Sequence, residues 1–321
     1  KNMYDIIPDK HNFMKHRVTD NHILTLKIRG HKSISQANRR YRNYTHVVDF
    51  LNREENKFQQ KYFNSIEDAQ KFINNFNDDD TLDITIENYL KLDKRIKDKL
   101  VLFKTESIHW ITKDVEMDPY LLGMWLGDGL SNGSGFALNY KTDFETLAYW
   151  EKWAQENDAV ITKDKRYKFS VVSRQNKEAT VNGLCNRVVE APLKKYLRKY
   201  NLLNNKHIPN EYLTNDRETR LKLLAGLIDT DGSVRANGHE IRICQGPANV
   251  RIIENTYTLA MSLGFCCGVK EGKSQWIDKK TGDKKFSTYK ELTITGDRIY
   301  EIPTLLPRKK LCQVENNTHL I

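Results

Sequence analysis

The sequence predicts an α+β fold in which one unit occurs twice, with the two copies related by a pseudo-two-fold axis. The expected elements follow the order helix, strand, helix, strands and helix from about Met117, and the same order begins again near Thr219. Each copy opens with a similar apolar segment that ends in Asp-Gly, namely Leu121–Gly129 and Leu224–Gly232. A recurring series of elements of this size is typical of an internal duplication.

The spacing of individual residues supports the duplication. Asp128 and Asp231 close the two apolar segments and lie 103 positions apart. Lys206 follows Leu-Leu-Asn-Asn and Lys309 follows Leu-Leu-Pro-Arg, and these two lysines also lie 103 positions apart in the sequence. Two separate anchor points with one offset indicate a structural repeat rather than chance.

Between these anchors, each copy contains the elements of a small sheet covered by a helix. In both copies a strand precedes an amphipathic helix, and the second copy adds a long hairpin around a turn-rich segment. The hairpin is mostly basic and polar, so we expect one of its faces to lie in a DNA groove rather than a core. The predicted strands are Gly135–Tyr140 and His239–Gln245, the helices Asp143–Asn157 and Ala248–Gly264, and the hairpin strands Ser274–Asp278 and Lys284–Lys290.

The first hundred residues differ in character from the repeat. The polar stretch His31–Tyr44 has neither helical nor strand periodicity, so it predicts a loop or a DNA-contacting arm. Ser65 and Asp68 resemble a capping box and predict a helix through about Phe76. Asp83–Lys99 predicts a short strand followed by a charged helix, which leads into the main body.

Composition narrows the class of protein. The net charge of +10 and pI of about 9.2 indicate a polyanionic partner, for which nucleic acid is the leading candidate. Neither an apolar run of about 20 residues nor a signal core occurs, so we expect no membrane span and an intracellular location. The five cysteines include no Cys-x-x-Cys pair and are expected to be free thiols.

The apolar segments carry the predicted chemistry. Gly123 and Gly226 interrupt helices where glycine costs about 1 kcal/mol relative to alanine, which close packing of the two helices would offset. Asp128 and Asp231 would then lie side by side at the helix C-termini, where the helix dipole and mutual repulsion disfavour two anions. A divalent cation bound between the carboxylates, phosphate and water would neutralise this site.

Leu224–Gly232 is similar to the LAGLIDADG motif, and Leu121–Gly129 looks like a more degenerate copy of it. The chain thus resembles the double-motif LAGLIDADG homing endonucleases, particularly those encoded within inteins, over about Asp118 to Lys310. This resemblance implies two αββαββα halves that bind double-stranded DNA as a monomer and hydrolyse one phosphodiester in each strand with Mg²⁺. The location would be the nucleus or wherever the host genome resides.

The resemblance also implies roles for individual residues. Asp128 and Asp231 would be the metal ligands, and Lys206 and Lys309 the basic catalytic residues, with Lys310 as a substitute for Lys309. Asn139 and Gln245 would hold water or metal, and Asp229 would be structural. Basic residues of the polar stretch and of the hairpin are the candidates for DNA binding: Lys32, Arg39, Arg40, Arg42, Lys273, Lys279, Lys280, Lys284 and Lys285.

The N-terminal segment resembles part of an intein splicing domain. Thr19 and His22 fit the Thr-x-x-His motif of that family, in which the histidine helps to activate the first peptide bond. The chain begins with Lys1 rather than Cys or Ser and lacks a terminal His-Asn, so splicing by this chain alone is not expected. We expect a partial, β-rich splicing (Hint-type) segment at 1–30, a DNA-recognition and linker region at 31–115, an endonuclease domain at 116–310 with halves 116–210 and 211–310, and a segment at 311–321 leading back to the splicing domain.

Two rival functions remain open at this point. One is a maturase-like protein that binds nucleic acid without cutting it. Intact Asp128, Asp231, Lys206 and Lys309 argue against this reading, since a binder gains nothing from two crowded carboxylates that face a polyanion. The other is an intein fragment that acts mainly in protein splicing, which the missing terminal nucleophiles disfavour.

Overall fold

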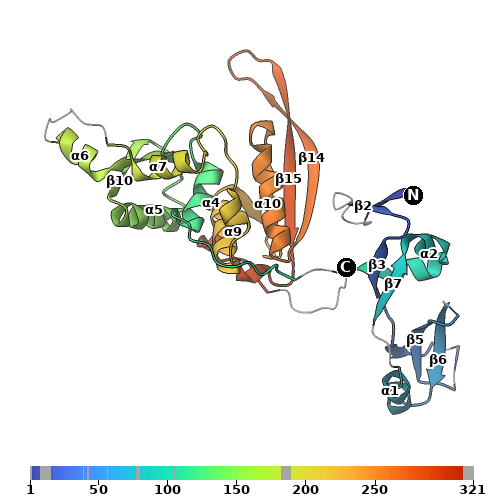
Figure 1. Cartoon of the computed structure of the whole chain (residues 1–321). Coiled ribbons are helices and arrows are strands. Elements are labelled where there is room, and N and C mark those ends of the chain that lie inside the picture. Colours follow the sequence, from blue (N-terminus) through green and yellow to red (C-terminus); the bar gives the residue numbers. More distant parts are fainter. Residues whose placement is uncertain are drawn as a thin grey trace. The chain divides into compact units, whose positions relative to one another are not determined.

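The computed structural model divides the chain into two compact units, Lys1–Thr105 and Glu106–Ile321 (Figure 1). The domain boundaries predicted from the sequence remain a prediction. The structure describes residues 2–7, 16–38, 40–41, 43–55, 57–76, 80–103, 106–181 and 189–313. Within these ranges, no helix is both long and apolar enough to cross a membrane.

Small antiparallel sheets build the first unit. Strands β1 (Met3–Ile6) and β2 (His16–Thr19) form a pair, and β3 (Ile23–Ile28) lies between β7 (Thr81–Thr85) and β8 (Leu100–Leu102). Leu24, Leu26 and Ile28 are buried whereas their neighbours Ile23 and Thr25 are exposed, which is the alternation of a half-buried strand. Two short helices, α2 (Ile86–Lys91) and α3 (Lys94–Lys97), complete this part.

A second sheet of the first unit consists of β4 (Ser33–Gln36), β5 (His46–Asn52) and β6 (Lys57–Phe63). Helix α1 (Ile66–Asn74) packs against it through Ala69 and Phe72, which meet Val48 and Phe50. The Ser65 hydroxyl accepts a hydrogen bond from the backbone N–H of Asp68, so the predicted helix start is confirmed. The prediction of a loop over His31–Tyr44 is wrong for residues 33–36, because pairing with β5 supplies the order that the local pattern lacks.

The second unit contains the repeat. Its first half comprises α4 (Pro119–Asp128), β9 (Gly135–Ala137), α5 (Phe144–Glu156), β10 (Ala159–Lys165), β11 (Lys168–Ser173), α6 (Arg174–Val181) and α7 (Pro192–Lys199). After α8 (Asn210–Leu213), the second half comprises α9 (Arg217–Asp231), β12 (Gly232–Val234), β13 (Glu240–Gln245), α10 (Val250–Ser262), β14 (Cys266–Ile277) and β15 (Lys284–Thr295). Short 3-10 turns follow at Pro247–Asn249 before α10 and at Ile299–Glu301 and Pro307–Lys309 after β15.

The two halves match the predicted αββαββα pattern unequally. The second forms a four-stranded sheet in the order β12-β13-β15-β14, whereas the first has three strands, β10-β11-β9. In place of a regular first strand, the first half has a single bridge between Gly129 and Phe136. The hairpin β14–β15 extends over 12 residues in each strand, longer than predicted, and projects beyond α10 (Figure 1).

Helices α4 and α9 lie side by side at the centre of the unit (Figure 1). A methyl group placed on Gly123 would lie 2.2 Å from the backbone oxygen of Leu223, and one on Gly226 would lie 2.1 Å from that of Tyr120. Both distances are well inside van der Waals contact, so only glycine fits. The close packing predicted from the two glycines is confirmed.

We expect Gly226→Ala to destabilise the protein despite the higher helix propensity of alanine. Propensity favours alanine by about 1 kcal/mol, but the methyl group would overlap backbone that cannot rotate away, and overpacking costs typically 1–3 kcal/mol or more. Urea unfolding should therefore show a net loss of about 2 kcal/mol. Gly133→Ala is the control, since a methyl group there meets nothing within 4 Å; equal stabilities of the two variants would contradict the packing argument.

Candidate active site

The site lies where the two central helices end. Asp128 is the last residue of α4 and Asp231 the last of α9, and the chain leaves each helix through a glycine, Gly129 or Gly232, in extended conformation. Both carboxylates are partly buried. The structure thus brings together the two aspartates that the repeat singled out.

The environment of the two carboxylates disfavours their charged forms. Burial, together with the negative charge of Asp231, raises the pKa of Asp128 to about 6, while Lys309 and Lys206 oppose the shift. Burial also raises the pKa of Asp231, and Lys206 and a hydrogen bond from Gln245 oppose it. Two carboxylates held together in this way are unfavourable until a cation neutralises them.

Lys206 and Lys309 occupy equivalent positions at the ends of the two helices. The Lys206 ammonium donates to the carbonyl oxygens of Leu126 at 2.9 Å and Gly127 at 3.3 Å. The Lys309 ammonium donates to those of Ile228 and Asp229 at 2.7 Å and Thr230 at 2.9 Å. Each lysine therefore binds carbonyls of the last helical turn, where most have no intrahelical partner, and its charge offsets the negative end of the helix dipole.

Both lysines are almost fully buried, with exposed fractions of 8% and 4%. Burial lowers the pKa of each to about 8, and the nearby aspartates oppose this shift. Lys310, considered as a substitute for Lys309, is exposed. The geometry therefore favours Lys309 as the basic residue of the second half.

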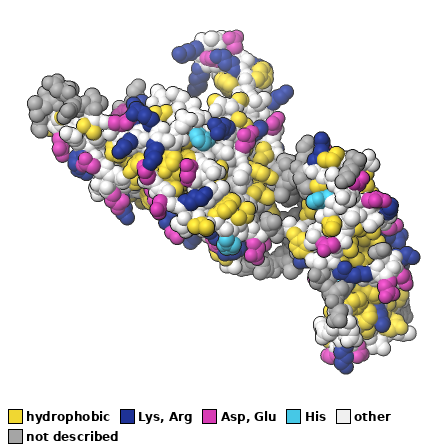
Figure 2. Space-filling model, in the orientation of Figure 1, with side chains coloured by type: hydrophobic (Ala, Val, Ile, Leu, Met, Phe, Trp, Pro, Cys, Tyr) yellow, Lys and Arg dark blue, Asp and Glu magenta, His cyan; other side chains and the backbone are white. Residues whose placement is uncertain are grey.

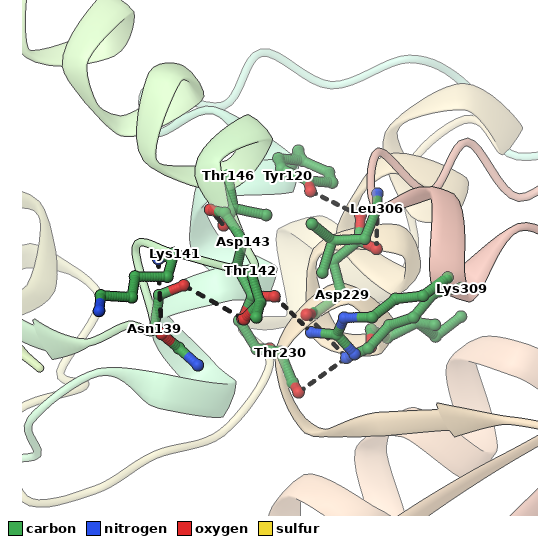
Figure 3. Close-up of polar contacts among 12 residues, drawn as sticks. Tyr120, Asn139, Lys141, Thr142, Asp143, Thr146, Asp229, Thr230, Leu306 and Lys309 are labelled. Carbon is green, nitrogen blue, oxygen red and sulfur yellow. Dashed lines mark hydrogen bonds and ion pairs between the residues drawn. The ribbon is translucent and has the colours of Figure 1, made fainter.

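Only one of the two predicted amides contacts an aspartate. The Gln245 side-chain amide donates to a carboxylate oxygen of Asp231. Asn139 is exposed, and its side-chain oxygen accepts from the backbone N–H of Lys141 at 3.4 Å (Figure 3). Within the described residues, Asn139 makes no hydrogen bond to Asp128.

The strand register explains the difference. Gly232 pairs with Ile243 and Gly129 with Phe136, so Gln245, two residues beyond Ile243, corresponds to Leu138 rather than Asn139. Successive residues of a strand point to opposite faces, so a shift of one position turns a side chain away from the site. The role of Asn139 stays a prediction, and the register does not favour it.

Asp229 lies inside the second motif but faces away from the carboxylate pair. Its side chain accepts hydrogen bonds from the Tyr120 hydroxyl at 2.6 Å and from the backbone N–H groups of Leu305 and Leu306 at 2.7 and 3.3 Å (Figure 3). The structural role predicted for it agrees with these contacts. They join α4 and α9 to the loop that carries Lys309.

One polar contact near the site was not anticipated from the sequence. Arg308 donates to the carboxylate of Asp143, the residue before α5, at 2.6 Å. The negative charge of Asp143 also acts on Asp128 and Lys309. The sequence feature that could have pointed to this contact is the position of Arg308, which directly precedes Lys309, one of the two lysines that recur at the repeat offset.

The basic candidates for DNA binding fall in both units. In the second, Lys273, Lys279, Lys280, Lys284 and Lys285 are exposed on the β14–β15 hairpin, and Figure 2 shows basic side chains around its projecting end. Lys285 forms an ion pair with Asp278. In the first, Arg40 is exposed and Lys32 lies 6.0 Å from the centre of the Phe76 ring, while Arg39 and Arg42 lie outside the described residues.

The Thr-x-x-His motif forms the turn between β2 and β3 in the first unit. The backbone N–H of His22 donates to the carbonyl of Thr19 at 3.1 Å, and the Thr19 hydroxyl donates to the side chain of Asn21 at 2.6 Å. The His22 side chain is exposed. The splicing role of Thr19 and His22 stays a prediction.

The raised pKa of Asp128 makes stability depend on pH in the metal-free protein. Its pKa is about 6 in the folded state, whereas the ordinary value for an aspartate is 3.8, so the folded protein binds more protons than the unfolded chain between these values. The contribution of Asp128 to the free energy of unfolding should therefore fall as pH rises from about 4 to about 6 and stay constant from there to pH 7. Asp128→Asn removes this titration and should stabilise the metal-free protein at pH 7 by on the order of 2 kcal/mol.

The measurement is urea unfolding of both proteins at pH 4 and pH 7 in the presence of a chelator. The gain from Asp128→Asn should be present at pH 7 and absent at pH 4. Asp158→Asn serves as the control, because the Asp158 side chain is 78% exposed. An equal gain at both pH values would show that the carboxyl titrates normally.

Comparison with known proteins gives a family match within the second unit. The family model for the homing endonuclease matches residues 207–301, which include the second apolar motif and Gln245. A replicative DNA helicase DnaB of Mycobacterium intracellulare is 30% identical over 176 residues, which are 55% of this chain and 24% of that protein. The chain thus spans about a quarter of the length of this relative.

Among solved structures, the crystal structure of I-DmoI in complex with DNA and Mn matches at 17% identity, with a TM-score of 0.29. The match covers 59% of this chain and 96% of that one. The family match extends over the second copy of the repeat, and the motif itself recurs in the first. Over residues 207–301 the chain matches the homing endonuclease family, and its two motifs make the second unit similar to homing endonucleases of the LAGLIDADG type.

Proposed function

We propose that the protein is a site-specific endonuclease that cuts both strands of a long, asymmetric DNA site in an intein-free allele of its host gene. The observation that carries this proposal is the pair Asp128 and Asp231, half-buried together at two helix ends, each helix capped by a buried lysine. Burial and the charge of Asp231 raise the pKa of Asp128, and carboxylates perturbed in this way cluster at functional sites.

The residues present fit a divalent metal such as Mg²⁺. Carboxylate oxygens are the ligands this ion prefers, and in phosphoryl-transfer sites it is usually held by one or two carboxylates, with substrate phosphate and water as the other ligands. Within the described residues, no group of three or more His, Cys, Asp or Glu side chains is arranged to hold a metal, and Asp128 and Asp231 are the carboxylates that would hold it here. A metal held there would lower the pKa of a bound water and stabilise charge on the leaving oxygen.

The protein's own side chains would prepare the site for this chemistry. Gln245 donates to Asp231 and fixes its orientation. Lys206 and Lys309 place positive charge beside the carboxylates in a partly buried environment, where charge that builds on a phosphate is stabilised more strongly than in water. Since an aspartate and a buried lysine recur in each half, each half would act on one strand.

DNA binding would draw on the basic surface of the hairpin β14–β15. A two-stranded ribbon fits the major groove, and the exposed lysines there can neutralise phosphates. Contacts of this kind make affinity depend on salt, with a slope that decreases by about one for each phosphate contact removed. Arg40 and Lys32 are candidates for further contacts made by the first unit.

Two alternatives stand behind this proposal. A protein that binds nucleic acid without cutting it would have no physical reason to keep two half-buried carboxylates directed at a polyanion. A protein whose main role is splicing would need a reactive environment at Thr19 and His22, whereas the His22 side chain is exposed. An origin within an intein of a DnaB-like helicase agrees with the relative that the chain matches.

The test is to incubate the purified protein with a plasmid that carries the intein-free host sequence, in buffer containing Mg²⁺. We expect linear DNA with ends at one position, and no cleavage when a chelator replaces the metal. A second plasmid, in which the intein coding sequence interrupts the site, provides the control and should remain uncut. If the protein binds the intein-free site but leaves both strands intact, the proposed nuclease function is wrong.

A further inference from the structure

The loops that carry the two lysines are each attached to the opposite half of the endonuclease domain. The residue before Lys309 is Arg308, whose guanidinium bonds to Asp143 at the start of α5 in the first half. The residue before Lys206 is Asn205, whose side-chain oxygen accepts from Arg251 in the first turn of α10 in the second half, at 3.0 Å. Arg308 and Asn205 are separated by the repeat offset of 103 positions, so the arrangement occurs in both halves.

The two attachments differ in strength. Arg308 and Asp143 form an ion pair in which the carboxylate is only 16% exposed, whereas Asn205 and Arg251 form an exposed hydrogen bond. The Lys309 loop is also held by Asp229, which binds Leu305 and Leu306 and in turn accepts from Tyr120 of the first half. The residue equivalent to Asp229 in the first half is Leu126, which has no carboxylate.

We propose that Arg308 and Asp143 form a latch between the halves that positions Lys309, so that breaking it slows cleavage of one DNA strand more than the other. The latch rests on the proposed nuclease function. Arg308 and Asp143 are positioning residues, since they act through the loop that presents Lys309 to the ends of the motif helices (Figure 3).

The ion pair between Arg308 and Asp143 contributes little to stability but can fix the position of Lys309. The Arg308 side chain is 51% exposed, and ion pairs at exposed positions contribute little to stability. Lys309, in contrast, is buried and bonds to three carbonyl oxygens, so a small displacement of its loop changes three contacts at once. Displacement of a reacting group by about 1 Å can reduce a rate on the order of 100-fold without unfolding the protein.

The variants are Arg308→Gln and Asp143→Asn, which remove the ion pair while keeping a polar side chain at each position. Arg308→Lys keeps the charge, and the exchange Arg308→Asp with Asp143→Arg restores the pair in reverse. Asn205→Ala is the matched change in the first half, where it removes the weaker attachment. Each protein is tested as the full chain.

The first readout is strand cleavage in a supercoiled plasmid that carries the site. Arg308→Gln and Asp143→Asn should accumulate nicked circles, with the rate for one strand on the order of 10-fold lower and KM unchanged. Arg308→Lys and the exchange should restore linear product. Equal slowing of both strands, or wild-type rates in both single variants, would overturn the latch.

The second readout does not need cleavage. An acylating reagent and mass spectrometry report how fast Lys309 and Lys206 react in each protein. Breaking the latch should expose Lys309 and leave Lys206 as protected as in the wild type, and the exchange should restore protection. Unchanged reactivity of Lys309 would refute the latch, whereas a wild-type protein that cuts neither strand but shows this pattern would refute only the nuclease function.

Discussion

Asp128→Asn and Asp231→Asn should each abolish double-strand cleavage while leaving DNA binding intact. Asparagine has almost the same size as aspartate, but it lacks the negative charge that holds a divalent cation. Without the metal, the activation free energy rises by several kcal/mol, so the rate for at least one strand should fall by about a thousandfold or more. The loss should appear in kcat, because the phosphate contacts that govern affinity remain.

The reference for both variants is Asp158→Asn, an exposed aspartate in the same unit. Asp158 has a φ of 52°, a conformation that Asn and Asp tolerate about equally, so this change alters charge without straining the backbone. It should cut both strands at the wild-type rate. Full activity in either motif variant would show that the carboxylate pair is not the catalytic centre.

Much of the second unit was predictable because its pattern occurs twice. Helices α4 and α9, their terminal aspartates and the buried lysines all rest on residues that recur at one offset, and the structure brings these four side chains together. Glycine at equivalent positions of both helices also predicted their close packing, which depends on backbone geometry alone. A pattern of this kind is specific because the same residues are improbable by chance at equivalent positions of both copies.

The rest depended on contacts that no local pattern reveals. Residues 33–36 form a strand only because β5 lies beside them, and the hairpin strands extend to 12 residues because they pair along their whole length. The sequence predicted Asn139 at the site because it follows the first motif on the next strand. The bridge between Gly129 and Phe136 instead makes Leu138 the equivalent of Gln245. The ion pair between Arg308 and Asp143 joins residues 165 positions apart, a separation that periodicity cannot detect.

Lys309→Met should reduce both stability and the cleavage rate, and the two effects can be separated. Methionine fills nearly the same volume but leaves the carbonyls of Asp229 and Thr230 without the lysine donor, while that of Ile228 keeps the backbone N–H of Gly232. Leaving the two buried carbonyl oxygens unpaired costs roughly 1–3 kcal/mol each, and relief of the buried charge, whose burial lowers the pKa of Lys309 to about 8, offsets part of this cost. The free energy of unfolding should therefore fall by about 2 kcal/mol.

The effect on the rate should be larger than the effect on stability. Removing a buried positive charge beside a developing anion should lower kcat on the order of 100- to 1,000-fold, and the folded fraction hardly changes for a loss of about 2 kcal/mol from a stable domain. Lys310→Met is a close control, since Lys310 is the next residue in the chain and is exposed. It should keep both stability and activity. If Lys309→Met lowers stability but cuts both strands at the wild-type rate, Lys309 is only a helix cap, because a positive charge needed by the reaction cannot be removed without slowing it.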